Sequence, residues 1–365
     1  MKHQTTRYGE IPFYKIGTFG NTADAFISKK LFLEYKTKYS FPKKGDILIS
    51  ASGTIGKAVI YDGKPAYFQD SNIVWIDNDE TLVKNDFLFY AYSNVKWNTE
   101  HTTILRLYND NFRNTLIPLP PLNEQNAIAN ILSDLDRYLC ALDALILKKE
   151  GVKKALSFEL LSQRKRLKGF NQAWQRVRLG DICEFGNGGV YETLIVENGD
   201  FKLISLNSID IDGNLKNTMK RVNFYDNSLK QDDIVMVLSD VAHGDFLGLC
   251  AVIPSNDYVL NQRMGRLRIR NDCINILFLR LYINANQKYF KMQGQGSSQL
   301  NLSKKAIEDF EILLPPLNEQ NAIANVLSAL DNEIISLKNK KRQFENIKKA
   351  LNHDLMSAKI RVLEK

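Results

Sequence analysis

A long, near-identical repeat constrains this chain more than any other feature. Residues 120–136 and 315–331 are identical at 15 of 17 positions, with an offset of 195; only Ile131/Val326 and Asp134/Ala329 differ. Chance does not produce such a match, and repeats are interpreted before any shorter motif. The 365 residues therefore contain one structural unit twice.

The repeat continues, at lower similarity, into the segments that precede the two identical blocks. Residues 44–50 resemble residues 231–239, and residues 58–60 match residues 251–253 as Ala-Val-Ile. Gln69 falls on Gln262 at an offset of 193. Each copy thus consists of a diverged module followed by a nearly invariant segment, which indicates one scaffold that carries two different surfaces.

Apolar residues after each Pro-Pro pair recur at steps of four and three. They are Ile128, Leu132, Leu135, Leu139, Leu142 and Ile146, then Ile323, Leu327, Leu330, Ile334, Leu337 and Phe344, with Lys341 in the intervening seam position. This heptad spacing is typical of a helix that packs along another helix. The pattern predicts helices that run to about Arg164 and Lys359. Two matched helices favour an antiparallel coiled coil; the alternative is two separate helical bundles.

The modules between the helices predict short β-strands. Runs rich in β-branched and aromatic residues lie between Gly, Asp, Asn and Pro, at residues 45–50, 57–61, 72–76, 233–238, 249–253 and 266–269. One short helical stretch is expected in each module, at residues 86–92 and 276–289. The predicted fold class is α+β: two β-rich modules joined and separated by two long antiparallel coiled-coil helices, with a pseudo-twofold internal repeat.

Composition limits the class of protein. The chain is 44% hydrophobic, its net charge is +8, and its apolar runs are far shorter than the ~20 residues that a membrane helix needs. The first residues have no apolar core of a signal peptide. The four cysteines form no Cys-x-x-Cys pair, which argues against a disulfide framework or zinc site. We expect a cytoplasmic protein without membrane contact, and the positive charge permits a nucleic-acid partner.

Motifs for catalysis are missing from the sequence. Gly53-Thr54-Ile55-Gly56-Lys57 resembles part of a phosphate-binding loop, but Ala51 and Ala58 replace residues that the Walker A pattern requires. A tight turn is the favoured interpretation. Both Pro-Pro pairs are followed by leucine rather than the aromatic residue of an adenine methyltransferase motif, and the histidines lack metal-ligand spacing. We expect no catalytic residue and no metal site.

The order of these elements resembles the specificity (S) subunit of type I restriction–modification systems. The likeness covers essentially the whole chain: module, Pro-Pro-Leu-Asn-Glu-Gln, long helix, then the same again. It implies target recognition domains at residues 1–120 and 169–314, and spacer helices at 121–168 and 315–365. It also implies double-stranded DNA with a bipartite site, two methyltransferase (M) subunits and restriction (R) subunits as partners. The S subunit would need no cofactor; S-adenosylmethionine, ATP and Mg²⁺ would bind the partner subunits.

One segment of the family pattern occurs only once. Residues 174–182, Trp-Gln-Arg-Val-Arg-Leu-Gly-Asp-Ile, resemble the usual start of a recognition domain. If Gly9 is matched to Gly199, Met1 falls on Tyr191, so the first module has no counterpart of residues 174–190. Either the first module lacks an edge strand, or the gene begins upstream.

Charge alone does not predict where DNA binds, because residues 171–314 hold 16 basic and 17 acidic residues. Arg266, Arg268 and Arg270 alternate in an expected strand, with Arg263 just before them; they form either a DNA-facing stripe or a solvated sheet face. The other candidates are polar residues in loops between strands. They are Ser52, Thr54, Lys57, Gln69, Thr102, Arg106, Ser239, His243, Asp245, Gln262, Gln295, Ser297, Ser298 and Gln299.

These observations predict a noncatalytic DNA-recognition scaffold. Two alternatives stay open from the sequence: a self-sufficient DNA methyltransferase or nuclease, and a helical protein-interaction scaffold without DNA contact. The absence of catalytic motifs argues against the first alternative. Sequence preference in a binding assay with the M partner would separate the predicted scaffold from the second.

Overall fold

The computed structural model describes residues 4–68, 72–97, 106–241 and 244–362. The chain divides into two compact units. Unit 1 comprises Met1–Leu145 and Leu337–Lys365, and unit 2 comprises Ile146–Ser336. Each unit therefore combines one sheet-rich module with part of both long helices, α4 (Leu122–Leu161) and α9 (Leu317–Met356).

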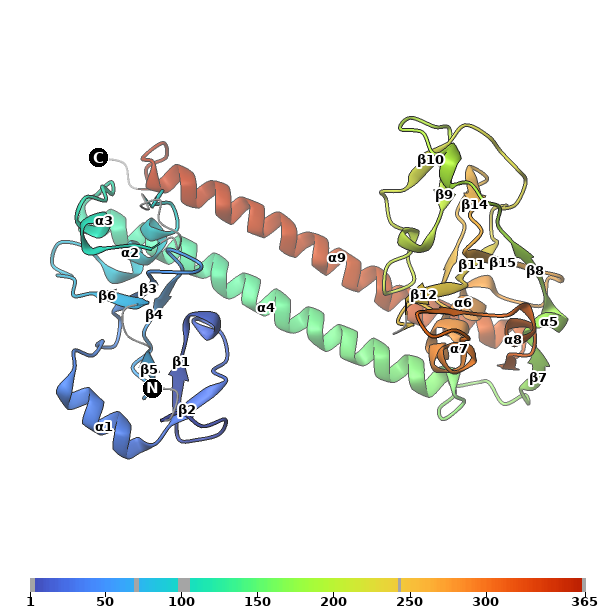
Figure 1. The fold of residues 1–365 in the computed structure, drawn as a ribbon, viewed down its shortest axis with the longest axis horizontal. Helices are drawn as coiled ribbons and strands as arrows, with labels where there is room; N and C mark the ends of the chain where they lie inside the picture. Colours follow the sequence, from blue (N-terminus) through green and yellow to red (C-terminus); the bar gives the residue numbers. More distant parts are fainter. Residues whose placement is uncertain (1–3, 69–71, 98–105, 242–243, 363–365) are drawn as a thin grey trace. The chain divides into compact units, whose positions relative to one another are not determined.

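In unit 1, two small sheets lie beside short helices (Figure 1). The sheet orders are β2-β1-β5 and β4-β3-β6, and the second sheet is antiparallel. The elements are β1 (Ile11–Tyr14), β2 (Ala25–Ile27), α1 (Lys29–Lys38), β3 (Ile47–Ser50), β4 (Ala58–Ile60), β5 (Tyr67–Phe68), β6 (Ile73–Ile76), α2 (Asn85–Tyr92) and α3 (Asn109–Arg113).

Unit 2 has a larger central sheet of order β13-β11-β15-β8 and a second sheet of order β10-β9-β14. Two strand pairs, β12-β16 and β17-β7, complete it. The elements are β7 (Gln175–Arg178), α5 (Leu179–Ile182), β8 (Cys183–Asn187), β9 (Phe201–Ile204), β10 (Lys220–Val222), β11 (Ile234–Val237), β12 (Ser239–Val241), β13 (Cys250–Val252), β14 (Tyr258–Leu260), β15 (Met264–Ile269), α6 (Ile276–Ala285), α7 (Gln287–Gln293), β16 (Gln299–Asn301), α8 (Lys304–Glu308) and β17 (Glu311–Leu314).

The central sheet of unit 2 is buried on both faces, so β11 is apolar at every position. Ile234 and Met236 pack in one core with α6, whereas Val235 and Val237 pack in another core with β9 and β14 residues. Side chains alternate between the faces of a strand, which explains this division. The predicted strands at 233–238, 249–253 and 266–269 are confirmed within two residues at each end.

The helical seam is confirmed in each unit. In unit 1, Ile128 and Leu132 of α4 share a core with Leu355 and Met356 of α9, and the rings of Tyr138 and Phe344 lie 4.7 Å apart. Lys341, the polar seam residue, forms an ion pair with Asp143 at 2.6 Å. Lys348 pairs with Asp136, so residue numbers rise along α4 as they fall along α9. The two segments are antiparallel.

The same order of contacts occurs in unit 2. Lys149 forms an ion pair with Glu333 at 2.8 Å, and Lys153 pairs with Asp331. Ile323 and Leu327 of α9 enter the unit 2 core beside Leu160 and Leu161 of α4. The helices end at Leu161 and Met356, about three residues before the predicted ends.

Buried hydrogen bonds explain why the start of each long helix is so well preserved between the copies. Gln125 accepts from the Lys84 backbone N–H at 2.8 Å and donates to the Pro120 carbonyl at 2.8 Å. Gln320 makes the equivalent bonds with Asn275 and Pro315, also at 2.8 Å. Both glutamine side chains are buried, where an unpaired amide would destabilise the fold. Glutamine is therefore required at both positions.

An ion pair with a buried carboxylate holds the chain that leaves each long helix. Arg166, after α4, binds Glu319 with Nε and Nη2, and Trp174 Nε1 donates to the same carboxylate at 3.0 Å. Arg361, after α9, binds Glu124 in the same bidentate way, at 2.6 and 2.5 Å. The hydrogen bonds and charge of Arg361 lower the pKa of Glu124.

Candidate nucleic-acid interface

In unit 2, three loop segments meet just beyond the end of β11. The Leu238 N–H donates to the Arg263 carbonyl at 3.1 Å, and the Leu238 carbonyl accepts from the Leu302 N–H at 2.9 Å. β12 pairs with β16, which places Ser239 opposite Asn301. Residues 239–241, 262–263 and 295–301 are thus fixed side by side by backbone bonds. We call them the unit 2 loop surface.

Polar side chains dominate the unit 2 loop surface. The Ser239 hydroxyl is buried and donates to Asn301 Oδ1 at 2.5 Å. Gln262, Arg263, Gln295, Ser297 and Ser298 are exposed, and Gln299 is half-buried. Most of the loop candidates predicted in unit 2 are therefore brought together, and all of these except Ser239 and Gln299 have exposed side chains.

Part of this surface is held rigid by the backbone. Gln295 and Asn301 exchange two backbone hydrogen bonds, at 3.0 and 2.9 Å, which closes a tight loop with Ser297 and Ser298 inside it. Gly296 has φ +122°, and a Cβ there would lie 2.1 Å from the Gln299 carbonyl oxygen. Only glycine fits this position.

Acidic side chains border the surface. Asp245 forms an ion pair with Lys291 at 2.8 Å. Glu192 accepts from Asn261 Nδ2 at 3.1 Å and from Gln262 Nε2 at 3.4 Å. The pKa of Glu192 is lowered by its own backbone N–H, by these amides and by the charge of Arg263. Asn261 and Gln262 are therefore oriented by an anion that stays charged at neutral pH.

Unit 1 brings its own loops together with the same backbone bonds. The Ala51 N–H donates to the Asn72 carbonyl and the Leu107 N–H donates to the Ala51 carbonyl, both at 2.8 Å. Ser52 is bridged to Arg106, and its hydroxyl donates to Asn72 Oδ1 at 3.0 Å. Ser52, Asn72 and Arg106 therefore occupy the places that Ser239, Arg263 and Asn301 hold in unit 2.

The other unit 1 candidates have mixed outcomes. Lys57 Nζ donates to the Phe19 carbonyl at 2.6 Å, so this amine is used within the module. Thr54 is exposed, in a turn where Gly53 and Gly56 have φ +68° and +78°. The turn predicted in place of a phosphate loop is thus confirmed. Gln69, Thr102 and His243 lie outside the described residues.

Strand register corrects one alignment made from the sequence. Ile47 pairs with Ile76 in β6, and its counterpart Ile234 pairs with Leu267 in β15. The offset there is 191, not the 193 that matched Gln69 to Gln262. From Ile234 to Leu267 unit 2 has four more residues than unit 1 has from Ile47 to Ile76, so the match of the two glutamines was a coincidence. The Ala-Val-Ile match is also out of register by one residue, because Ile47 pairs with Ile60 and Ile234 pairs with Val252, an offset of 192.

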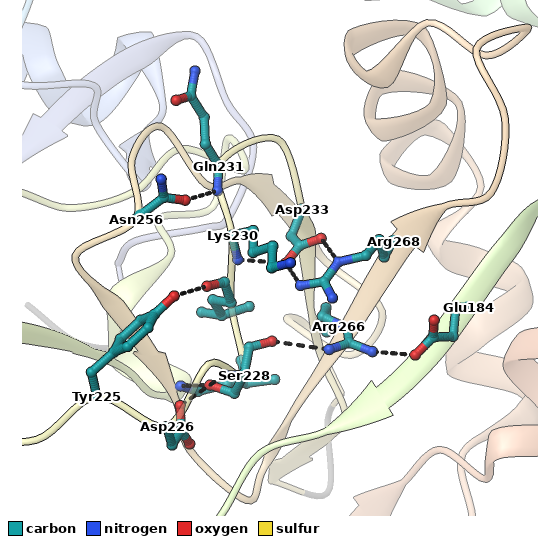
Figure 2. A network of polar contacts seen from close by, with 12 residues as sticks. Glu184, Tyr225, Asp226, Ser228, Lys230, Gln231, Asp233, Asn256, Arg266 and Arg268 are labelled. Carbon is teal, nitrogen blue, oxygen red and sulfur yellow. Dashed lines mark hydrogen bonds and ion pairs between the residues drawn. The ribbon is translucent and has the colours of Figure 1, made fainter.

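Arg266 and Arg268 are bound by carboxylates of the chain itself (Figure 2). Arg268 donates to both oxygens of Asp233, at 2.8 and 2.7 Å, and these bonds raise its pKa. Arg266 donates to Glu184 at 2.6 Å and to the Ser228 carbonyl at 3.1 Å, and its side chain is 13% exposed. Asp233 precedes β11, whereas the loop surface follows it. These contacts argue against an arginine stripe on DNA and leave Arg263 as the exposed arginine of the loop surface.

Several residues in or beside the assembled loops of the two units were not among the sequence candidates. Asn72, Glu192, Asn261, Lys291 and Asn301 are each linked to a candidate by a bond or by backbone pairing. Asn72 is the first residue of the expected strand 72–76, so the strand pattern could have indicated it, whereas no strand was expected near Asn301. Glu192 is 69 residues from Asn261, and no local signal links the two.

Two further results concern the described part of the chain. No group of three or more His, Cys, Asp or Glu side chains there could hold a metal ion. None of its helices combines the length and apolar character that crossing a bilayer requires.

Comparison with known proteins agrees with this architecture. The family model described as "Type I restriction modification DNA specificity domain" matches residues 1–149 and 171–346. The "Type I restriction enzyme MjaVIII specificity subunit" of Methanocaldococcus jannaschii is 28% identical over 93% of this chain and 84% of its own length. The "Putative type I restriction enzyme specificity subunit S.HindORF215P" of Haemophilus influenzae is 62% identical, over 37% of this chain and 36% of that protein.

A solved structure supports the fold independently. The type I restriction–modification S subunit from M. genitalium aligns with a TM-score of 0.64 at 18% identity, over 98% of this chain and 91% of that one. The predicted α+β class and the internal repeat are thereby confirmed. Because the family model matches both copies of the repeat and most of the sequence, the chain belongs to the type I restriction–modification DNA specificity (S) subunit family, whose members are not themselves the enzymes of the system.

Proposed function

We propose that the two units recognise the two halves of a bipartite DNA site, one half each. The observation that carries this proposal is the loop architecture. Both units fix their loops with the same backbone bonds, yet the side chains differ: Asn72 and Arg106 in one, Arg263 and Asn301 in the other. A common scaffold with different hydrogen-bonding groups would select different bases.

The proposed contacts follow from side-chain chemistry. Arg263 can donate two hydrogen bonds to a guanine edge, and Gln262 or Gln295 can pair with adenine. Ser297 and Ser298 suit either bases or phosphates. Since residues 171–314 are not basic overall, the proposed phosphate contacts come mainly from partner subunits.

We propose that two M subunits dock on the repeated helix starts, and that R subunits join that complex. Identity between the copies extends to exposed positions, where packing does not explain it: Asn130 and Asn325 are exposed in their units. Leu122 and Leu317 are 37% and 39% exposed. Two identical surfaces suit two copies of one partner. The helices would then hold the half-sites at a fixed spacing.

The division of labour follows from this assembly. We propose that S-adenosylmethionine, ATP and Mg²⁺ bind the M and R subunits, and that this chain needs no cofactor. An M subunit would flip the target adenine out of the duplex for methylation. Because the proposed substrate is genomic DNA, the complex would act in the cytoplasm.

The decisive experiment is methylome sequencing of cells with and without this gene. A bipartite methylated motif should disappear on deletion and return on complementation. A complementing Arg263→Ala variant should weaken or relax only one half of the motif. Its matched control is Lys57→Ala, because that amine is bound within the module. A methylome unchanged by deletion would refute the proposal.

A further inference from the structure

Strands β12 and β16 form a two-stranded antiparallel ribbon on the unit 2 loop surface. Their register places Val241 opposite Gln299, Asp240 opposite Leu300 and Ser239 opposite Asn301. A ribbon of two β-strands is one of the elements that the major groove of B-DNA admits. The ribbon therefore has a shape that suits contact with base edges.

One face of the ribbon is used within the module. The Asp240 carboxylate accepts from the Val241 N–H at 2.8 Å and from the Phe246 N–H at 2.7 Å. Leu300, opposite Asp240, packs against the main core of the unit. Side chains alternate between the two faces of a strand, so Val241 and Gln299 lie on the opposite face. That outer face is turned away from the core.

Hydrogen bonds order the outer face without using its apolar and amide groups. The Ser239 hydroxyl donates to Asn301 Oδ1 at 2.5 Å, and Asn301 Nδ2 donates to the Gln299 carbonyl at 3.3 Å. Val241 is 66% exposed. The Gln299 side-chain amide forms no hydrogen bond with any residue that the structure describes. An exposed valine alone is ordinary, but here it lies opposite an unused amide on an ordered ribbon.

The chemistry of this pair matches the major-groove edge of one base pair. An A·T pair presents the adenine N7 acceptor and N6 donor, followed by the thymine O4 and C5 methyl group. A glutamine amide pairs with N7 and N6 together, and an apolar side chain contacts the methyl group. Directly opposite residues have Cβ atoms about 5 Å apart, so Gln299 and Val241 can contact the two bases of one pair. A G·C pair offers neither the N6 donor nor the methyl group.

We propose that Val241 and Gln299 together recognise one A·T base pair in the half-site of unit 2. This inference rests on the proposed function and adds the identity of a base pair to it. Gln299 selects the adenine, and Val241 selects the thymine on the other strand. The adenine that is methylated is a different one, because a base flipped out of the duplex no longer presents its edge in the groove.

The test uses the full chain with its M partner and DNA duplexes that carry the methylated motif. Deoxyuridine in place of thymine removes only the C5 methyl group, and 7-deazaadenine in place of adenine removes the N7 acceptor. Each A·T pair of the motif is substituted in turn, and binding is measured by electrophoretic titration. At one pair, each analogue should weaken wild-type binding about fourfold, the effect of one buried methyl group or one hydrogen bond.

Two variants assign these effects to the two side chains. Val241→Ala should weaken binding of unmodified DNA about fourfold and abolish the effect of deoxyuridine at that pair, while 7-deazaadenine still weakens binding. Gln299→Ala should abolish the effect of 7-deazaadenine and keep that of deoxyuridine. The control Val152→Ala removes the same atoms from a 46% exposed valine of α4 and should keep both effects. Circular dichroism should report the same fold for all three variants.

The outcomes separate this inference from the proposed function. A wild-type complex that does not prefer the motif to random DNA would overturn both. If the motif is preferred but no A·T pair responds to both analogues, the function stands and the inference is wrong. Equal responses of Val241→Ala and Gln299→Ala to the two analogues would also overturn the inference, because the contacts would then not belong to these side chains.

Discussion

Arg268 donates to both carboxylate oxygens of Asp233, and that carboxylate is only 2% exposed. The Lys230 N–H donates to the same group at 2.7 Å. Arg268→Met should therefore leave a buried anion without its cation. We expect the free energy of unfolding of unit 2 to fall by about 2–3 kcal/mol. Breaking a fully buried ion pair costs ~3–5 kcal/mol, and we expect a smaller loss here because Arg268 is 29% exposed. Chemical denaturation followed by Trp174 fluorescence would measure it.

The matched control is Arg270→Met, at an exposed arginine just past the end of β15. It should change the unfolding free energy by less than ~0.5 kcal/mol. Equal effects of the two substitutions would contradict a structural role for the Asp233 pair.

The Glu124–Arg361 pair predicts an acid-sensitive tail. Arg361 lowers the pKa of Glu124 in the folded chain, so the pair stabilises the fold above the unfolded carboxyl pKa of about 4.3. This contribution is lost as the pH falls through the lowered value. Hydrogen exchange of residues 357–362 should accelerate between neutral pH and pH ~3, after correction for intrinsic exchange rates. In the Glu124→Gln variant, hydrogen exchange of residues 357–362 should already be fast at neutral pH and should change little as the pH falls. If the variant instead shows the same pH dependence as the wild type, the Glu124–Arg361 pair is not the cause.

Each long helix contributes a leucine to the core of a different unit. Leu132 packs in unit 1 and Leu327, its repeat partner, packs in unit 2, and both are fully buried. Leucine-to-alanine changes at such sites cost about 2–5 kcal/mol. Leu132→Ala should destabilise unit 1 and Leu327→Ala unit 2, each measured by hydrogen exchange of that unit. Uniform destabilisation of both units by either variant would show that they unfold as one.

Arg263 provides the clearest prediction for DNA. Its side chain is exposed, while its carbonyl ties the loop to Leu238, so Arg263→Ala removes the guanidinium and keeps the backbone bond. With the M partner present, we expect a loss of about 1–3 kcal/mol on the cognate site and little change on random DNA. Electrophoretic titration against both DNAs would measure it. An equal loss on both would identify a phosphate contact instead.

Periodic features were predictable from the sequence. The seam from Ile128 to Ile146 and the strands around Ile47 and Ile234 were predicted because burial repeats at a helical or strand period. Among the described residues of unit 1 no strand corresponds to β7, which was expected because residues 174–182 occur once. In each case the signal lies within a short window of sequence.

Features that depend on distant partners were not predictable. The alternation of Arg266 and Arg268 indicated one sheet face but gave no sign of Glu184 or Asp233, which lie 82 and 35 residues away. Lys57 was a candidate DNA-binding residue, but its amine donates to the Phe19 carbonyl, 38 residues away. Strands β1, β2 and β5 were missed because they are short and their sequences do not alternate between polar and apolar residues.

Unit 1 is built from two separate segments of the chain, and this affects the order in which the newly made protein can fold. One of its cores places Leu355 and Met356 beside Phe87, Ile128 and Leu132, so these three residues emerge from the ribosome long before their last packing partners exist. Unit 2 is complete once Ser336 has emerged. Domains usually fold from the N-terminal end during synthesis. Here unit 2 can be complete first, while this one core of unit 1 waits for the end of α9 with its apolar residues exposed to chaperones.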